Sequence, residues 1–239
     1  MGYKYIEKSI EKIDGKALAS GDEIFTDDVD IDCYHGVFVR SPHPYAKILD
    51  IENLEQIKKF NGVKEVFWYK NTPQTLYTSA GQGYPEPSPY DCRMFSEYVR
   101  YAGEPVALIV ADTLENAENA ASSLVVKYEE KKPLFDFVNA ESSDVIVHYK
   151  DGSFAKIPVR YEPDKNLAAY VEVEAGKFKE NYEKSERKLS RIYGNHIAQH
   201  CAIEPHAAIA YFDQRGRLTI ITTTQVPFHA RRITSMVTG

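Results

Sequence analysis

The chain has 239 residues, which is long enough to bury the core of one large domain or of two smaller ones. Apolar residues make up 43% and charged residues 27%, a balance typical of globular proteins. The formal net charge of −6 at pH 7, without a basic stripe in any segment, argues against a general binder of nucleic acids or anionic membranes.

The sequence also argues against a membrane anchor and against an iron–sulfur cluster. The longest apolar run, Val106–Ala111, is too short to cross a bilayer, and the N-terminal stretch lacks the apolar core of a secretory signal. The three cysteines are widely separated and form no CxxC motif, so this chain alone cannot hold a cluster. These are Cys33, Cys92 and Cys201. We therefore expect a cytoplasmic protein that does not act at a membrane.

Strands and a helix alternate at the start of the chain. The β-rich segments 36–40 and 46–51 are separated by a stretch with two prolines. Segment 52–60 places apolar residues on one helical face and is followed by Asn-Gly, a helix stop, before a strand over 63–69. Residues 72–96 are rich in Pro, Gly, Ser and Tyr, which predicts a long surface excursion.

A second strand–helix–strand unit follows. Residues 104–111 predict a nearly all-apolar strand, and residues 125–129 predict the returning strand. Between them, segment 114–124 has a narrow apolar stripe at helical spacing. Asp112, followed three residues later by Glu115, predicts a capping box at the start of this helix.

The second half of the chain has a different pattern. Residues 135–166 have weak periodicity and scattered Pro, Gly and Asp, which predicts a connecting segment. Strand-like patterns follow over 168–176 and 189–205, and two strands flank the turn sequence DQRG at 213–216. The last ten residues, 230–239, have a helix-like pattern. The whole predicts an α+β first domain and the opening hairpins of a second domain.

Four phrases together resemble one family, the molybdenum-binding large subunit of the xanthine dehydrogenase/aldehyde oxidase group of molybdenum hydroxylases. They occur in family order at 7–28, 37–51, 99–129 and 200–232, so that the similarity extends over nearly the whole chain. Lys12 departs from the pattern, because arginine is usual there. Each phrase alone is moderately specific, whereas four at the correct spacing are a strong signal.

The resemblance implies a fold with four parts. These are an N-terminal arm (1–20), an α/β-hammerhead domain (21–135), a connecting segment (136–166) and an incomplete N-terminal part of the molybdenum cofactor-binding domain (167–239). In the family, a glutamine after the last strand donates a hydrogen bond from its amide to an oxo ligand of the molybdenum, and Gln225 is the matching position. The alternative is that Gln225 only ends a strand and bonds local backbone.

The resemblance also implies a reaction, hydroxylation of a carbon centre with oxygen from water, and a set of partners. The family's glycine-rich loop beside the metal and its base glutamate lie beyond the end of this sequence, so we expect no catalytic residue here and no metal ligand, and little activity from this chain alone. The expected cofactor is a molybdopterin-type molybdenum cofactor shared with a missing C-terminal portion. Iron–sulfur clusters and FAD are expected on partner subunits, and homo-oligomers are an open alternative. A small-molecule substrate is expected, and purines, aldehydes, N-heterocycles and carbon monoxide all stay open.

A rival hypothesis is a non-catalytic hammerhead-type module for interaction or assembly.

Three other motifs have weaker functional interpretations. In the first motif, a cluster of metal-binding side chains, His196 and His200 would meet one zinc ion if the segment were a helix. The neighbouring segments read as strands, however, and on a strand the two histidines would lie about 13 Å apart, too far for one ion. The glycine-containing stretch 79–87 lacks phosphate-loop spacing and predicts a surface loop. Arg40 and His43 favour packing or a subunit contact over catalysis. The residues of the zinc cluster are His196, His200, Cys201, Glu204 and His206.

Overall fold

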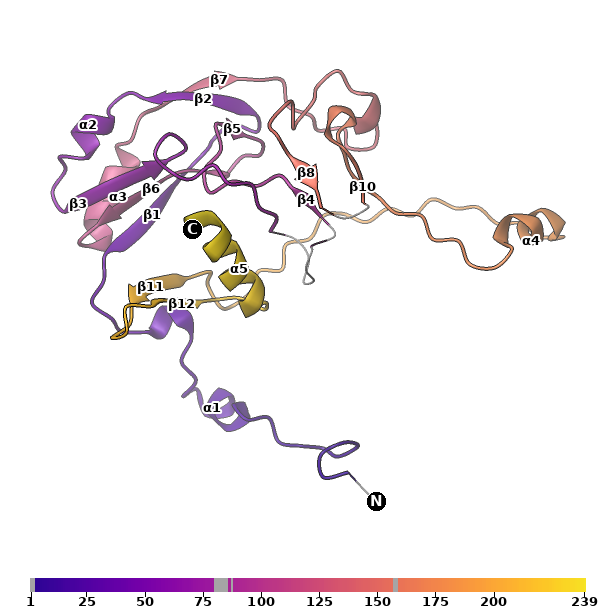
Figure 1. The fold of residues 1–239 in the computed structure, drawn as a ribbon, viewed down its shortest axis with the longest axis horizontal. Coiled ribbons are helices and arrows are strands. Elements are labelled where there is room, and N and C mark those ends of the chain that lie inside the picture. Colours follow the sequence, from indigo (N-terminus) through magenta and orange to yellow (C-terminus); the bar gives the residue numbers. More distant parts are fainter. Residues whose placement is uncertain (1–2, 80–85, 87, 157–158) are drawn as a thin grey trace. The chain divides into compact units, whose positions relative to one another are not determined.

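The computed structural model describes residues 3–79, 86, 88–156 and 159–239 (Figure 1). Contacts between residues divide the chain into two units. Unit 1 consists of Met1–Asp32 and Arg191–Gln225, and unit 2 of Cys33–Ser190 and Val226–Gly239.

Unit 2 contains two antiparallel sheets of three strands each, in the orders β1-β6-β3 and β5-β2-β7 (Figure 1). The predicted strands of the first half are confirmed, and the mixed helix and strand content confirms the α+β class. The strands of the first sheet are β1 (His35–Arg40), β6 (Pro105–Ala111) and β3 (Val63–Trp68). Those of the second are β5 (Tyr98–Val99), β2 (Ala46–Ile51) and β7 (Val126–Glu130).

Two helices connect these strands. Helix α2 (Leu54–Ile57) is shorter than the predicted segment 52–60, and α3 (Leu114–Ser122) lies inside the predicted 114–124. Gly62, which follows α2, has a φ of +76°, in the region that favours glycine. A Cβ atom at Gly62 would lie 2.0 Å from Oδ1 of Asp112, so this close approach of backbone to side chain also requires glycine.

The predicted capping box at Asp112 and Glu115 is wrong. Thr113 is the N-cap of α3, because it has an extended backbone and its Oγ1 accepts a hydrogen bond from the backbone N–H of Asn116 at 3.2 Å. Asp112 lies one residue too early to reach that N–H. Its Oδ1 instead accepts a hydrogen bond from the side-chain amide of Asn116 at 2.8 Å.

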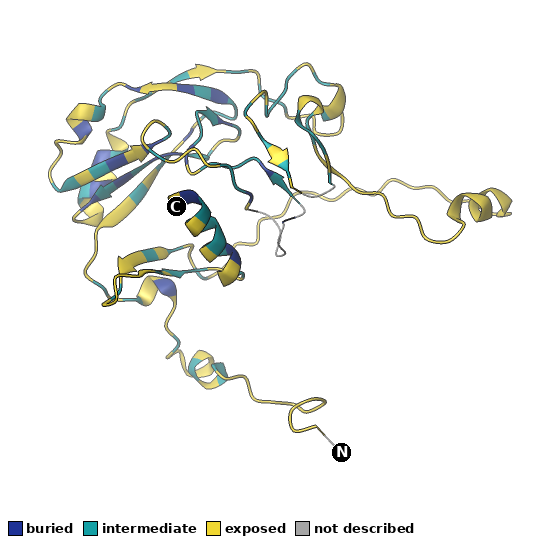
Figure 2. Cartoon of the chain, in the orientation of Figure 1, coloured by how far each residue is buried: buried dark blue, intermediate teal, exposed yellow. Residues whose placement is uncertain are grey.

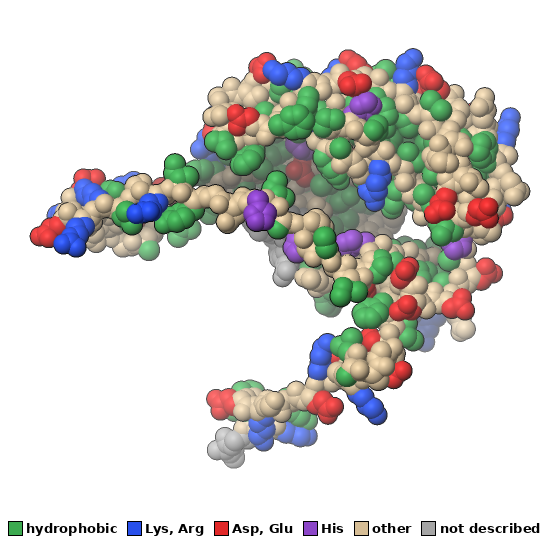
Figure 3. All heavy atoms as spheres, turned by 180° about the vertical axis from the view of Figure 1, so that it is seen from behind, with side chains coloured by type: hydrophobic (Ala, Val, Ile, Leu, Met, Phe, Trp, Pro, Cys, Tyr) green, Lys and Arg blue, Asp and Glu red, His purple; other side chains and the backbone are tan. Residues whose placement is uncertain are grey.

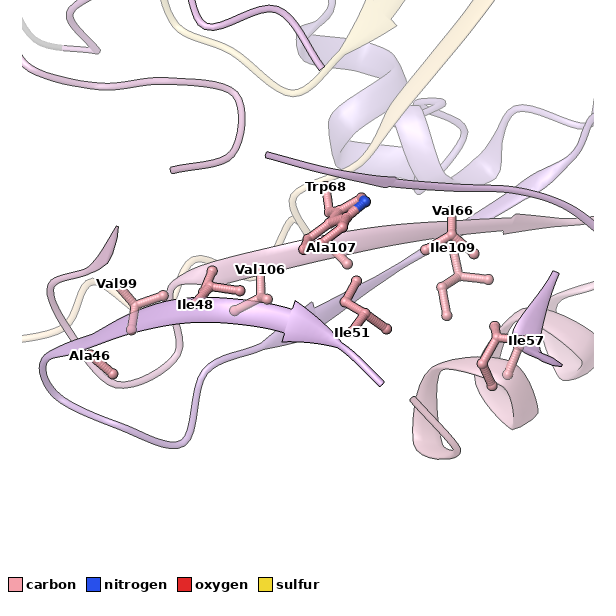
Figure 4. Close-up of a cluster of buried hydrophobic side chains, with 11 residues drawn as sticks. Ala46, Ile48, Ile51, Ile57, Val66, Trp68, Val99, Val106, Ala107 and Ile109 are labelled. Carbon is pink, nitrogen blue, oxygen red and sulfur yellow. The ribbon is translucent and has the colours of Figure 1, made fainter. Parts of the chain in front are cut away.

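One apolar cluster fills the core of unit 2 (Figure 4). Ile48 of β2, Val66 of β3 and Ile109 of β6 have no exposed surface, and Ile57 of α2 is equally buried. Burying an aliphatic side chain of this size contributes about 1.5–3 kcal/mol. The only tryptophan of the chain, Trp68, is 4% exposed in the same cluster, so its fluorescence can report on unfolding of unit 2. Figure 2 shows the buried residues concentrated on these sheets and on α3.

The predicted connecting segment contains short regular elements. Strand β8 (Phe154–Ala155) pairs with β4 (Pro89–Tyr90), and β9 (Arg160–Glu162) pairs with β10 (Leu167–Tyr170). Short 3-10 helices span Ala140–Ser142 and Pro163–Lys165. The segment is therefore ordered in part by a local pairing, β9 with β10, and in part by a long-range pairing, β8 with β4.

A buried ion pair fastens this segment to the strands before it. Nη2 of Arg100 lies 2.9 Å from Oδ2 of Asp151, and Nδ1 of His148 lies 2.6 Å from the same oxygen. Burial raises the pKa of Asp151, but the hydrogen bonds from His148 and Ser153 outweigh it and hold that pKa well below its usual range. The carboxylate is therefore ionised at neutral pH, and it accepts hydrogen bonds from Arg100 and His148.

Of two further strand predictions in the second half, one is confirmed only in part and one is wrong. Strand β10 covers residues 168–170 of the segment predicted as 168–176, and 189–205 contains no strand among the described residues. A β-like sequence needs a neighbouring strand for its backbone hydrogen bonds, and neither 171–176 nor 189–205 has one among the described residues. Between them lies helix α4 (Phe178–Lys184), which is exposed throughout.

Unit 1 contains a β-hairpin, and its prediction is confirmed. Strands β11 (Ala208–Phe212) and β12 (Leu218–Thr222) pair in antiparallel register around the DQRG turn. Asp213 fixes the turn, since its carboxylate accepts hydrogen bonds from the backbone of Arg215 and Arg217 at 2.9 Å each. Unit 1 also contains the short helix α1 (Gly15–Ser20) and a 3-10 turn at Thr26–Asp28.

The chain ends in helix α5 (Pro227–Thr238), which belongs to unit 2. The helix predicted over 230–239 is confirmed, and it begins three residues earlier. Proline at its first position is favourable there, because that residue has no N–H to leave unsatisfied. Among the described residues, no helix has the length and apolar character needed to span a bilayer.

Candidate functional site

Gln225 lies in the connection between β12 and α5, and its side chain is exposed. Strand β12 ends at Thr222, so Gln225 follows the last strand by three residues. The register would place Gln225 opposite Pro205, which has no N–H to donate, and the ladder stops before that point. The amide of Gln225 makes no hydrogen bond to any other described residue, which leaves it available to an external acceptor.

Threonine side chains hold the backbone just before Gln225. Oγ1 of Thr223 donates to the carbonyl of Pro205 at 3.0 Å, and Oγ1 of Thr222 donates to the carbonyl of Ala207 at 3.2 Å. Oγ1 of Thr223 also lies 3.5 Å from a carboxylate oxygen of Glu204. These contacts are compatible with a structural role for the Glu-Pro corner and fix the end of the hairpin that leads to Gln225.

The residues of the proposed zinc cluster are largely exposed and lie outside regular secondary structure. His196 and His200 are in an irregular stretch, so they do not share a helical face. Cys201 has a φ of +48°, which interrupts an extended conformation. In the part of the chain that the structure describes, no group of three or more His, Cys, Asp or Glu side chains could hold a metal ion.

The structure describes the motif of Arg40 and His43 but only two residues of the stretch 79–87. Nη1 of Arg40 donates to the carbonyl of Gly103 at 2.9 Å, and the ring of His43 meets the ring of Tyr128 edge-on with centroids 4.8 Å apart. Both side chains thus pack within unit 2. The glycine-containing stretch 79–87 falls outside the described residues, apart from Ser79 and Glu86.

A cavity of about 370 Å³ in unit 2 is lined by Cys92, Glu104 and His148, among others. Burial raises the pKa of the Cys92 thiol, and burial also raises the pKa of the Glu104 carboxyl. A thiol with a raised pKa carries little thiolate at neutral pH. These side chains therefore do not form the activated nucleophile of a cysteine hydrolase.

A buried polar cluster that the sequence did not indicate joins the excursion 72–96 to α5. Glu86 is 2% exposed, and its Oε1 accepts hydrogen bonds from Nε and Nη2 of Arg232 at 2.9 and 2.5 Å. The hydroxyl of Tyr90 donates to the other carboxylate oxygen of Glu86. We call Glu86, Tyr90, His229 and Arg232 the α5 clamp.

The carboxylate of the α5 clamp stays ionised at neutral pH. Burial raises the pKa of Glu86, but the hydrogen bonds from Tyr90 and Arg232 outweigh burial and lower the pKa to about 2. Nη2 of Arg232 also lies 2.8 Å from Nδ1 of His229. Because a guanidinium can only donate, Nδ1 accepts and a neutral His229 carries its proton on Nε2.

The α5 clamp overturns part of one prediction. The excursion 72–96 was expected to run over the surface, yet Tyr90 is 1% exposed and Phe95 is 3% exposed. Composition rich in Pro, Gly and Ser predicts irregular backbone but does not show which side chains find a distant partner. Arg232 follows Glu86 by 146 positions, and no local pattern connects two residues so far apart.

Comparisons with known proteins were made with the whole chain. Residues 20–132 match the domain family described as aldehyde oxidase and xanthine dehydrogenase, a/b hammerhead domain, and residues 160–239 match the molybdopterin cofactor-binding domain. The two matches occur in the order that the sequence predicted and cover both units in part.

Individual relatives show the same similarity. The chain is 31% identical to the protein named "probable hypoxanthine oxidase XdhD" of Escherichia coli (strain K12), over 98% of the chain and 27% of that protein. It is 26% identical to the nicotinate dehydrogenase large molybdopterin subunit of Eubacterium barkeri, over 93% of the chain and 47% of that subunit. The chain thus spans about a quarter of the length of the E. coli relative.

A solved structure shows the same fold. The CO dehydrogenase of Oligotropha carboxidovorans superposes with a TM-score of 0.72 at 21% identity, over 96% of this chain and 29% of that one. This similarity includes the hammerhead and cofactor-binding parts, and confirms the architecture that was expected from the sequence.

Proposed function

The chain belongs to the xanthine dehydrogenase and aldehyde oxidase family of molybdenum enzymes, and from this premise we propose that it is the N-terminal part of a molybdenum hydroxylase large subunit. The reaction proposed is hydroxylation of a carbon centre with oxygen from water. The observation that supports this most is the hammerhead and cofactor-binding matches in one chain and in family order. The proposed activity requires polypeptide beyond this chain.

The proposed contribution of this chain to the reaction centre is Gln225. Its exposed amide has no partner among the described residues, so it can donate to an oxo ligand of a molybdopterin-type cofactor without first breaking a protein hydrogen bond. The Thr222 and Thr223 contacts hold the preceding backbone and limit how far this amide can move. When bound, the cofactor supplies the oxygen-transfer and redox chemistry.

We further propose the partners of the chain. These are a polypeptide that completes the cofactor-binding domain, an iron–sulfur subunit and an FAD subunit, and the substrate is a small molecule. The name of the E. barkeri relative, a large molybdopterin subunit, supports assembly from several chains. All three cysteines are free thiols, which fits a reducing cytoplasm.

The test is co-expression of the chain with a polypeptide that supplies the rest of the cofactor-binding domain and with iron–sulfur and FAD subunits. Substrate-dependent reduction of a dye is measured for the wild type and for Gln225→Ala. We expect activity in the assembly and a kcat about a hundredfold to a thousandfold lower for Gln225→Ala, since removal of one hydrogen-bond donor to a developing oxyanion has an effect of that size.

Gln214 in the hairpin turn offers a matched control, because it is also an exposed glutamine. Gln214→Ala should leave kcat unchanged. A loaded assembly in which Gln225→Ala has the wild-type kcat would refute the role of Gln225. An assembly that never binds molybdenum would favour the rival hypothesis, a hammerhead-type module that serves interaction or assembly only.

A further inference from the structure

A second cavity of unit 2, of about 480 Å³, is lined mainly by polar side chains. Its walls come from the excursion 72–96, from β5 and the residues next to it, and from the connecting segment. All of these residues belong to unit 2, so the cavity lies within one unit. Its charged lining residues are Arg93, Glu97, Arg100, Lys150 and Asp151.

Both carboxylates of this cavity are already paired with cations. Nζ of Lys47 lies 3.2 Å from a carboxylate oxygen of Glu97. Asp151 is bound by Arg100 and His148, at 2.9 and 2.6 Å from one of its oxygens. These pairings use the negative charge of the cavity, so neither carboxylate is left to neutralise a further cation.

Two cations of the cavity, by contrast, form no ion pair with any described residue. Nη2 of Arg93 donates to the carbonyl of Asp151, which fixes the guanidinium. Nε and Nη1 of Arg93 have no partner among the described residues. Nζ of Lys150 lies 4.9 Å from the centroid of the Tyr149 ring. The surplus charge of the cavity is therefore positive.

The backbone of Lys150 is strained. Its φ is +50°, in the left-handed region that residues other than glycine rarely adopt. Such a conformation costs free energy and is retained where surrounding contacts impose it, often at binding sites. Here Asp151 holds the next turn, since its Oδ1 accepts a hydrogen bond from the backbone N–H of Ser153 at 3.0 Å. The strained residue thus stays on the cavity wall that also contains Arg93.

We propose that this cavity binds a phosphate group, with Arg93 and Lys150 as its counter-ions. A phosphate monoester carries about −1.5 to −2 charges at pH 7, which matches two unpaired cations. Guanidinium and ammonium groups are both common donors to phosphate oxygens. The volume is typical of small-molecule sites, so a phosphate monoester fits as well as inorganic phosphate. This inference is independent of the proposed role of Gln225.

Equilibrium dialysis of the full chain against radiolabelled inorganic phosphate, at constant ionic strength set with chloride, tests the site. We expect saturable binding of one phosphate per chain. Arg93→Gln should lower the affinity about tenfold to a hundredfold, since a hydrogen bond to a charged group contributes that much. Arg187→Gln is the matched control, because it removes the same charge from an exposed arginine outside the cavity, and it should leave the affinity unchanged. Binding that does not saturate, or that is equal in Arg93→Gln and the wild type, would overturn the proposal.

Lys150→Gln covers the case in which Arg93→Gln does not fold, because the side chain of Lys150 is exposed. It should lower the affinity about twofold to fivefold, since an exposed cation attracts an anion only weakly. Lys127→Gln removes the same charge from an exposed position of β7 and should have no effect. Equal affinities in Lys150→Gln and Lys127→Gln would contradict the assignment of Lys150.

Competition with glycerol phosphate distinguishes the two sources of the phosphate group. A site for a monoester binds glycerol phosphate at least as tightly as inorganic phosphate, whereas a site for free phosphate binds it at least about tenfold more weakly. Either result supports a phosphate site, provided that the two compounds displace each other. A chain that binds neither compound would refute the site and leave the proposed function of Gln225 untouched.

Discussion

At the residue scale, the most informative side chain is Glu86, because its charge is buried and paired. Its pKa is lowered to about 2 in the folded chain, so the folded state favours the ionised form. A group with a lowered folded pKa contributes stability that is present above its unfolded pKa, near 4.5, and that is lost as the pH falls toward about 2. The clamp should therefore weaken only in acid.

Glu86→Gln should lower the free energy of unfolding by about 3–5 kcal/mol at pH 7, because it leaves Arg232 without its buried counter-ion. At pH 2.5 the difference between wild type and variant should be much smaller, since this pH lies well below the unfolded pKa of 4.5 and only slightly above the folded pKa of about 2. Urea unfolding followed by Trp68 fluorescence measures both values. A difference that is the same at both pH values would show that the charge of Glu86 is not what matters.

The residue scale also shows a limit of sequence reasoning. Gln225 was inferred from its place in a family phrase, and the structure places it three residues after the end of β12. The sequence contained no indication of the α5 clamp, because neither composition nor periodicity relates Glu86 to Arg232, which lies 146 positions later. Long-range pairing of single polar residues depends on the completed fold, and a local pattern does not contain it.

At the element scale, the cap of α3 is the clearest feature that the structure corrects. Thr113→Ala should destabilise unit 2 by about 1 kcal/mol, because it removes the acceptor for the N–H of Asn116. Thr113→Ser is the matched control and should lose a few tenths of a kcal/mol at most. The midpoint of urea unfolding, again followed by Trp68, measures these changes. Equal losses in the two variants would argue that the methyl group of Thr113, not its hydroxyl, stabilises the helix.

A predicted strand was confirmed where a second segment of the same domain pairs with it. The strands at 36–40, 46–51 and 104–111 were confirmed, because each has an apolar pattern and a neighbouring strand within the same domain. The segment 189–205 has comparable apolar residues, but among the described residues it has no neighbour and forms no strand. A strand is a property of at least two segments, so its prediction fails when the second is missing.

At the scale of the whole molecule, the hairpin of unit 1 exposes apolar side chains. Phe212 and Leu218 are cross-strand partners and are 74% and 46% exposed, and Ile220 on the same face is 38% exposed. Hydrophobic side chains also lie at the surface elsewhere, among charged ones (Figure 3). Exposed apolar strands with open edges tend to associate with other chains.

We therefore expect the chain on its own to self-associate. Light scattering after size-exclusion chromatography should give a mass well above the 27.2 kDa of one chain. Phe212→Lys should shift the distribution toward the monomer, because it places a charge on the apolar face. Gln214→Lys adds the same charge in the turn and should have little effect. A wild-type chain that is monomeric and melts cooperatively would contradict this expectation.

The central claim is that this chain provides part of the binding site for a molybdenum cofactor, and the molybdenum content of purified protein tests it most directly. Inductively coupled plasma mass spectrometry should find close to one molybdenum per chain when the chain is purified with the polypeptide that completes its cofactor-binding domain. It should find almost none when the chain is purified alone. A stable complex of the two polypeptides that is free of molybdenum, from cells that load other molybdenum enzymes, would contradict the account.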